Sequence, residues 1–263
     1  MISVDLSKAG NRNSDPCGEP LLLFQSDRHA VYHIGTAEDS AFRSNCYLLT
    51  DGSESLLIHP RGIYEFSFLY HQLNTILSKE PVTGLVISGA DADNSALTEW
   101  LKNYPGCRLF TTPFIHLMLT SCGKEEYTFH DVREEDRFLF TSGRSLKFIP
   151  APFLPSPAAF ACYDETSGFL FSGDIWAAMD MDWHLVVDDF HDHEMKMNLF
   201  HIDHMASNIS ARGFLNRIGD LKITAILPHH GSILPKPFVN EAMDYLRRLK
   251  CGTDLFYPDI KQF

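Results

Sequence analysis

Three apolar runs in this chain each end in a loop of acidic or imidazole side chains, and this repeated pattern constrains the fold most strongly. The runs Leu85–Ile87, Phe169–Ser172 and Ile223–Leu227 have the length and composition of buried β-strands. Because α/β proteins usually keep their ligand sites at the carboxyl ends of strands, loops in these places are candidate site loops. The pattern predicts an α/β fold with one shared polar site.

The other apolar runs alternate between strand-like and helix-like spacing, and their order predicts two sheets. Strands are expected at Leu21–Phe24, Ala30–Ile34, Cys46–Leu49, Leu56–Ile58, Arg108–Thr111, Tyr127–His130, Arg137–Thr141, Leu146–Ile149 and Ala159–Tyr163. Helices are expected at Tyr64–Ser78, Ser95–Tyr104, Ile115–Thr120, Phe200–Ile218 and Val239–Leu249. This order is typical of two packed sheets covered by helices on their outer faces. The predicted fold is a four-layer αββα sandwich.

The length and composition indicate one domain. A chain of 263 residues with 44% hydrophobic content can bury one large core. Residues 1–19 show no apolar periodicity and are rich in turn-forming residues, so we expect them to form an N-terminal tail. Residues 20–263 are expected to form the domain itself.

Charge and cysteine usage exclude several classes of protein. The net charge of −12 is spread along the chain, which argues against nucleic acid as a partner. The chain has no apolar run of the roughly 18 residues that a membrane span needs, and its start lacks the apolar segment of a signal peptide. The six cysteines form no C-x-x-C pair, which favours reduced thiols and a cytoplasmic protein.

The three loops carry side chains suited to a metal site, although each also has an ordinary interpretation. Asp91 and Asp93 lie between a strand and a helix, where Asp commonly caps the helix N-terminus. Asp174 follows a glycine, as turn residues often do, and His229 and His230 could be exposed loop residues. Together, the three loops predict a pocket for one divalent metal.

The ordered motifs resemble the metallo-β-lactamase superfamily and, within it, the flavodiiron and oxygen-binding di-iron proteins. The family's first metal motif, His-x-Glu/Asp-x-Asp, falls on Gly89, Asp91 and Asp93. Its bridging Asp, after a Leu-Phe-Ser-Gly run, falls on Asp174, and its last His, in a His-Gly pair, falls on His230. The resemblance implies the αββα fold and an iron-binding ancestry.

The resemblance extends beyond the ligands and covers Tyr32 to Pro258. The segment Asn45-Cys46-Tyr47-Leu48 is similar to the family's opening Asn-x-Tyr-Leu hairpin. His59 stands where the family's following Asp-Pro-Gly turn has its Asp. Related family members are commonly dimers, so the resemblance also implies a homodimer.

Two departures from the family remove nitrogen donors from one of its two iron positions. Gly89 stands where that iron has its first histidine, and Pro155, after a Pro-Phe-Leu run, stands where it has its second. Neither residue has a side-chain donor. The predicted metal ligands are therefore Asp91, Asp93, Asp174 and His230. Without a metal, the crowded aspartates are expected to raise one another's pKa, so that one of them is protonated or a nearby Lys or Arg, Mg²⁺ or Na⁺ balances their charge.

A helical pair of histidines is a further ligand candidate. His201 and His204 are three residues apart and share a helix face. Their alternative role is that of a surface or capping pair, because such spacings also arise by chance.

The resemblance and its departures lead to three hypotheses on function. The first is a degenerate domain that acts as a non-catalytic sensor or scaffold in signalling, with no catalytic residue. It would bind no flavin and at most one divalent metal, for which the resemblance implies iron. The second is a residual iron site that binds O2 or another small gas as a redox sensor. The third is a metal-dependent hydrolase, which usually needs a histidine cluster that the first loop lacks.

Overall fold

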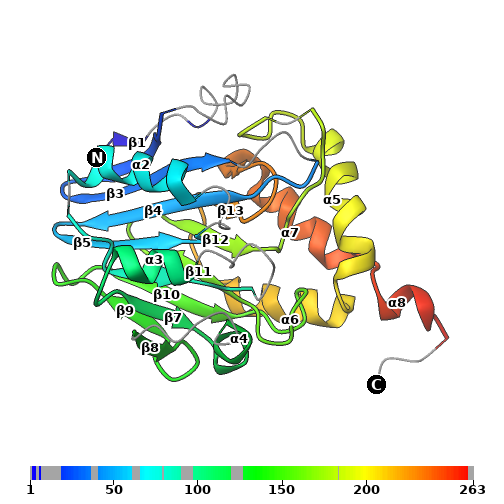
Figure 1. Cartoon of the computed structure of the whole chain (residues 1–263). Helices are drawn as coiled ribbons and strands as arrows, with labels where there is room; N and C mark the ends of the chain where they lie inside the picture. Colours follow the sequence, from blue (N-terminus) through cyan, green and yellow to red (C-terminus); the bar gives the residue numbers. More distant parts are fainter. Residues whose placement is uncertain are drawn as a thin grey trace.

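Two β-sheets stacked face to face form the centre of the molecule (Figure 1). The computed structural model describes residues 2–3, 6, 19–36, 41–60, 66–78, 80–89, 97–119, 127–182 and 184–259. Aromatic rings from the two sheets meet between them: the ring centroids of Tyr47 and Phe171 lie 5.5 Å apart, and those of Phe110 and Phe148 lie 5.8 Å apart. The sheets therefore share one apolar core.

The first sheet contains eight strands within the described residues, and they neighbour one another in chain order. They are β1 (Ile2–Ser3), β2 (Leu21–Ser26), β3 (His29–Thr36), β4 (Asn45–Asp51), β5 (Glu54–Ile58), β6 (Gly84–Val86), β7 (Arg108–Thr111) and β8 (Thr128–Asp131). Neighbours from β1 to β5 are antiparallel, whereas those from β5 to β8 are parallel. Parallel neighbours need crossover connections, and helices supply them here.

The second sheet contains six strands within the same described part of the chain, in the order β14-β13-β12-β11-β10-β9. They are β9 (Arg137–Leu139), β10 (Ser145–Pro150), β11 (Phe160–Asp164), β12 (Phe169–Gly173), β13 (Ala225–Pro228) and β14 (Leu234–Pro235). Only β12 and β13 of these neighbours run parallel. A long helical segment connects them.

Helices cover the outer faces of both sheets, and this confirms the predicted αββα sandwich (Figure 1). The helices are α2 (Phe66–Leu77), α3 (Leu97–Asn103), α4 (Pro113–Leu119), α5 (Phe190–His204), α6 (Asn208–Ile218), the 3-10 turn η3 (Lys236–Phe238), α7 (Val239–Arg248) and α8 (Thr253–Phe256). Leu73 of α2 and Trp100 of α3 join the core of the first sheet. Phe200 of α5, Phe214 of α6 and Tyr245 of α7 pack with the outer face of the second sheet.

The stretch Phe200–Ile218, predicted to be helical, is divided by the structure into the end of α5 and the whole of α6. Helix α5 already begins at Phe190, where the Asp189 carboxylate accepts hydrogen bonds from backbone N–H groups of the first turn. The chain becomes extended at Met205, and Ser207 then caps α6. The many polar residues of α5 leave little apolar periodicity to mark its first turns.

The chain's start contributes to the first sheet. Ile2 and Ser3 pair with Gln25 and Phe24 at the edge of the sheet. The division into a tail of residues 1–19 and a domain of residues 20–263 otherwise stays a prediction, since most of the tail lies outside the described residues. In the described part of the chain, the helices are too short or too polar to cross a membrane.

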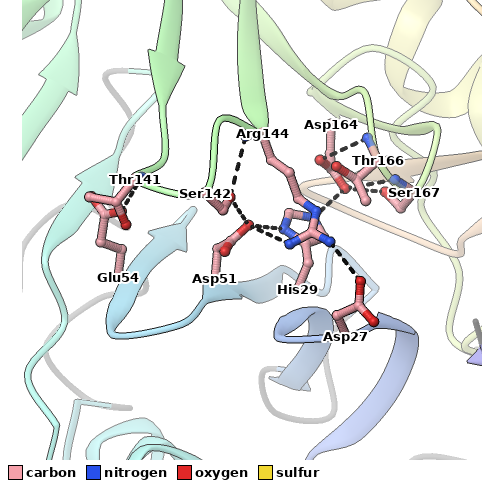
Figure 2. A network of polar contacts seen from close by, with 10 residues as sticks. All are labelled: Asp27, His29, Asp51, Glu54, Thr141, Ser142, Arg144, Asp164, Thr166 and Ser167. Atoms are coloured by element: carbon pink, nitrogen blue, oxygen red, sulfur yellow. Dashed lines mark hydrogen bonds and ion pairs between the residues drawn. The ribbon is translucent and has the colours of Figure 1, made fainter.

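A buried polar network joins the two sheets at the end of the sandwich where β4 and β11 finish (Figure 2). His29 is fully buried, and its Nδ1 lies 3.0 Å from Asp51 Oδ2 while its Nε2 lies 2.9 Å from Asp164 Oδ2. Arg144 also reaches Asp51, at 3.4 Å, and Asp27, at 3.1 Å. Burial favours neutral histidine, but the two carboxylates outweigh it and raise the His29 pKa.

Candidate metal centre

Four strands from the two sheets end at one edge of the sandwich, at the end opposite the His29 network. In the first sheet, β5 is followed by His59, and Ser88 lies just beyond β6. In the second sheet, β12 is followed by Asp174 and β13 by His229. Parallel pairing puts the carboxyl ends of β5 and β6 side by side, and likewise those of β12 and β13. This is where α/β folds usually carry a ligand site.

Asp174, His229 and His230 form the candidate metal centre. One ligand atom from each lies within 4.8 Å of the others, and among the described residues no other three His, Cys, Asp or Glu side chains come as close together. Nδ1 of His230 lies 3.1 Å and Nδ1 of His229 lies 3.6 Å from Asp174 Oδ1. Both histidines are buried, and the Asp174 side chain keeps 17% of its surface exposed. The cluster is thus mostly enclosed by protein.

Asp174 is ionised in this arrangement. Burial alone would raise the pKa of its carboxyl group, but the adjacent His229 imidazole and the hydrogen bond with His230 outweigh that effect and hold the pKa well below its usual range. The expectation that crowded aspartates raise one another's pKa stays a prediction, because Asp91 and Asp93 lie outside the described residues. The partners of Asp174 in the described part of the site are imidazoles, which favour the charged carboxylate.

His59 borders the cluster from the first sheet. Its ring is 4% exposed, and its centroid lies 4.4 Å from that of His229. Its Nε2 shares a hydrogen bond of 2.8 Å with Ser88 Oγ. Burial, reinforced by the neighbouring His229, lowers the pKa of His59 well below its usual value. The ring is therefore neutral, which is the form of histidine that binds metals.

An aromatic stack restrains the ring of His230. The Phe42 ring lies nearly parallel to it, with the two centroids 3.8 Å apart. Phe200 of α5 in turn stacks on Phe42 at 5.1 Å. The stack forms an apolar wall beside the cluster and limits rotation of the His230 imidazole.

Asn45 and Tyr47 of β4 hold the loop that carries the two histidines. Nδ2 of Asn45 donates hydrogen bonds to the carbonyls of Pro228, at 3.0 Å, and Gly231, at 2.8 Å. The Tyr47 hydroxyl donates to the Pro228 carbonyl at 2.9 Å, and the Asn45 backbone N–H donates to the His229 carbonyl. The Asn-x-Tyr-Leu segment of the first sheet thus positions the metal-binding loop of the second.

The structure places the helical histidine pair outside the cluster. His201 is fully buried. Its Nε2 accepts a hydrogen bond from the backbone N–H of Trp176 at 2.9 Å, and its Nδ1 donates to the Met197 carbonyl at 2.8 Å. Burial lowers its pKa to about 4, in keeping with a neutral ring. His204 is exposed on α5. His201 therefore positions the turn that follows Asp174, with both ring nitrogens already engaged.

Two of the four predicted ligands meet in the described part of the site. Asp174 and His230 are hydrogen-bonded to each other. Asp91 and Asp93 lie outside the described residues, so their role as ligands stays a prediction. Pro155 lies in the loop between β10 and β11, where it follows a cis peptide bond, and it carries no donor.

His59 and His229 are site residues that the motif comparison did not assign as ligands. A signal for each was present in the sequence. His59 replaces the Asp of the family's Asp-Pro-Gly turn, and His229 directly precedes the His-Gly pair. Their proximity depends on two strands of different sheets, which single-sequence patterns do not reveal.

The described donor set fits one metal ion. Two imidazoles and a carboxylate suit a divalent cation of borderline hardness, such as Fe²⁺ or Zn²⁺. A pair of metals about 3.5–4 Å apart would need a second set of donors. The described residues contain no second cluster of that kind.

The fold is that of a metallo-β-lactamase sandwich, and the cluster at its strand ends consists of side chains that can bind a metal. The chain belongs to the ODP family: the model described as ODP family beta lactamase matches residues 42–231. A solved structure of the chemotaxis sensor ODP with a peroxy di-iron species is 27% identical, with a TM-score of 0.78, and the match covers 91% of this chain and 100% of that chain. The apo state of the chemotaxis sensor ODP from T. denticola is 26% identical, with the same TM-score of 0.78, over 92% of this chain and 99% of that one.

More distant relatives share the fold within longer proteins. The flavodiiron protein from Giardia intestinalis is 19% identical, with a TM-score of 0.72, over 83% of this chain and 57% of that chain. The anaerobic nitric oxide reductase flavorubredoxin of Aeromonas salmonicida is 27% identical over 147 residues, which is 55% of this chain and 28% of that protein. An uncharacterized protein of Methanocaldococcus jannaschii is 23% identical over 225 residues, 80% of this chain and 53% of that protein. The chain thus spans about a quarter to a half of these curated relatives.

Proposed function

We propose that this chain is a sensor or scaffold domain of the ODP family that catalyses no reaction and holds at most one metal ion. The observation that carries the proposal is the donor set. Asp174, His229 and His230 offer ligand atoms within 4.8 Å of one another. Gly89 and Pro155 stand where the family resemblance places two histidine ligands of one iron, so that iron position is degenerate. Function follows the site and not the fold alone.

The similarity to a chemotaxis sensor supports a signalling role. That likeness covers more than nine tenths of this chain, so it concerns the whole sandwich and not a shared motif. The site also has a route for a signal, because the His229–His230 loop bonds directly to the other sheet. The Gly231 N–H donates to the Arg43 carbonyl at 3.0 Å, next to the bonds from Asn45. A change at the metal would therefore act on β4.

A second candidate function is a mononuclear iron site that binds O2 or another small gas. It is supported by the description of the related sensor, whose structure contains a peroxy di-iron species. Three protein ligands leave coordination positions for water or for a small ligand. The metal, when bound, would supply the redox chemistry, while Phe42 and the buried histidines would limit access of water.

The proposal includes a cytoplasmic homodimer that signals to another protein. The cysteines of the described residues are buried thiols outside any disulfide, which supports a reducing compartment; they are Cys46, Cys107, Cys162 and Cys251. Met195, Leu199 and Ile202 of α5 expose apolar side chains along one helix. Exposed apolar side chains that lie together are a common feature of protein contact surfaces.

Metal content decides between these alternatives. The full chain is purified without chelators or a nickel column, loaded anaerobically with Fe²⁺, desalted and measured by elemental analysis. We expect at most one iron per chain. We also expect no EDTA-sensitive turnover of phosphodiester or thioester substrates. An O2-dependent absorption change that disappears in His230→Ala, but persists in a variant of the exposed His71, would favour the gas-binding function. Two tightly bound irons per chain would overturn the proposal.

A further inference from the structure

His59 adopts a backbone conformation that side chains rarely take. Its φ of 57° lies in the left-handed region, which favours glycine. The residue follows β5 directly, at the carboxyl end of a strand with a parallel neighbour. Residues in such conformations persist where the surrounding structure fixes them, and they occur most often at functional sites.

The two ring nitrogens of His59 have different surroundings. Nε2 lies 2.8 Å from Ser88 Oγ. Nδ1 is buried without a hydrogen-bond partner in the described structure, and the ring as a whole is 4% exposed. An unpaired buried nitrogen is unfavourable in a protein interior. If Nε2 carries the ring proton, its N–H donates a hydrogen bond to Ser88 Oγ, and the lone pair of Nδ1 is available to bind a metal. Histidine ligands are commonly fixed in this way, with one ring nitrogen on the metal and the other in a hydrogen bond.

His59 also lies next to the other donors. Its ring centroid is 4.4 Å from that of His229, and the two ring planes are tilted by 32°. His229 in turn reaches Asp174, with 3.6 Å between Nδ1 and Oδ1. His59 interacts electrostatically with Asp174 and His230 as well. His59 lies beside the three donors but outside the group whose ligand atoms come within 4.8 Å of one another, so it must move toward them for all four to hold one ion.

We propose that His59 is the fourth protein ligand of the site, so that one divalent transition metal is held by His59, His229, His230 and Asp174. The inference rests on the proposed function in assuming a single metal position. The inference goes beyond the proposed function because it assigns two imidazoles, those of His59 and His229, in place of the nitrogen donors lost at Gly89 and Pro155. Three nitrogens and one carboxylate suit Zn²⁺ or Fe²⁺. They disfavour Mg²⁺ and Ca²⁺, which prefer oxygen ligands.

This ligand set would connect the two sheets through the metal. His59 belongs to the first sheet, whereas Asp174, His229 and His230 belong to loops of the second. Occupancy would then fix the distance between the ends of β5 and β13. A sensor of this design responds to the metal, or to a ligand of the metal, by changing how the two sheets meet.

Cobalt substitution tests the ligand set directly. The full chain is stripped of metal and titrated anaerobically with Co²⁺, whose visible absorption reports coordination number and donor type. We expect one Co²⁺ per chain with a low-coordinate spectrum. His59→Phe should shift that spectrum and lower the affinity by at least about 100-fold, the upper end of the effect of losing an outer-shell partner. His71→Phe, an exposed histidine on α2, is the matched control and should change neither.

The outcomes separate the inference from the proposed function. If His230→Ala abolishes binding while His59→Phe leaves affinity and spectrum unchanged, His59 is no ligand, but the single-metal site stands. A wild-type chain that binds no Co²⁺ would overturn the inference and leave a metal-free scaffold. Two Co²⁺ per chain would overturn the proposed function itself.

A measurement on the wild type covers the case in which His59→Phe does not fold. Co²⁺ shifts the proton signals of its ligands strongly in NMR spectra. Three shifted, exchangeable imidazole N–H signals are expected, one from each histidine ligand. Only two such signals in H2O, with neither sensitive to Ser88→Ala, would exclude His59 from the metal.

Discussion

His29 Nε2 and Asp164 Oδ2 lie 2.9 Å apart and join the two β-sheets across the buried interior. The other ring nitrogen reaches Asp51 Oδ2 at 3.0 Å. Because both nitrogens face carboxylate oxygens, both donate, and the imidazole carries a positive charge. This contact lies where β4 ends, whereas the candidate metal centre lies where β4 begins. The sandwich is therefore fastened at one end by an ion pair and at the other by the histidine loop.

Replacing His29 with Gln should lower the free energy of unfolding by about 3–5 kcal/mol at mildly acidic pH, because it leaves the buried Asp164 carboxylate without its charged partner, whereas Asp51 keeps Arg144. Urea unfolding followed by circular dichroism measures the change. His71→Gln, at an exposed position of α2, should stay within about 0.5 kcal/mol of the wild type. Equal stability of the two variants would show that His29 contributes no more than a surface residue.

The same comparison made against pH tests the charge of His29. Its pKa in the folded protein is raised above the ordinary value of 6.5. The stabilisation is therefore fully present below pH 6.5 and is lost as the pH rises through the folded pKa. The difference in unfolding free energy between wild type and His29→Gln should be largest near about pH 5.5 and smaller near about pH 8.5. A difference that grows with pH would contradict the assignment.

The order of strands and helices could be predicted from the sequence because it rests on local apolar spacing. The expected strand Arg108–Thr111 coincides with β7, and the runs before Asp174 and His229 are β12 and β13. Helix α5 was predicted to begin too late, because its first turns are stabilised by the Asp189 cap and by tertiary packing and not by an apolar stripe.

The candidate site could be predicted only in part. Asp174 and His230 follow apolar strands, and the family motifs point to them directly. His59 and His229 meet because β5 and β13, from different sheets, end at the same edge of the sandwich. The distance between two sheets depends on how the whole core packs, and a sequence pattern of one strand contains no information on it.

Asn45→Ala should destabilise the protein and weaken metal binding together. The substitution removes the hydrogen bonds that Asn45 makes with the Pro228 and Gly231 carbonyls and with the His33 imidazole. The Pro228 carbonyl keeps the bond from Tyr47, so the loss is counted per hydrogen bond, at about 0.5–1.5 kcal/mol each, and about 2–4 kcal/mol in total is expected in urea unfolding. Asn103→Ala, at an exposed bond on α3, is the matched control. Unchanged stability and Co²⁺ affinity in Asn45→Ala would show that Asn45 does not hold the loop that carries His229 and His230.

Gly231→Ala should disturb the histidine loop through a steric clash. Gly231 has a φ of 88°, and an added Cβ would lie 2.8 Å from the Ala178 backbone nitrogen and 3.0 Å from its carbonyl oxygen. The left-handed conformation alone costs a side chain roughly 1–2 kcal/mol, and the loop must also move. Gly213→Ala in α6 meets no atom within 4 Å and should stabilise its helix by about 0.5–1 kcal/mol. Thermal unfolding of the two variants should therefore change in opposite directions.

His193→Phe should make the protein less sensitive to acid. His193 is buried on α5, and its Nε2 has no hydrogen-bond partner within the described structure. Burial, assisted by Lys196, lowers its pKa to about 4 in the folded protein. Between pH 6.5 and about 4 the unfolded chain binds a proton at this residue that the folded chain does not, so the wild type loses stability as the pH falls.

The loss attributable to His193 should reach about 3 kcal/mol, since one pKa unit corresponds to about 1.4 kcal/mol. Urea unfolding at a series of pH values between neutral and mildly acidic measures it. The Phe variant should lose less stability over this range than the wild type, although His201, whose pKa is also about 4, keeps part of the acid sensitivity. His191→Phe, an exposed position on the same helix, serves as the control and should follow the wild-type curve. Parallel curves for wild type and His193→Phe would mean that His193 titrates alike in the folded and unfolded chain, and the buried environment assigned to it would then be wrong.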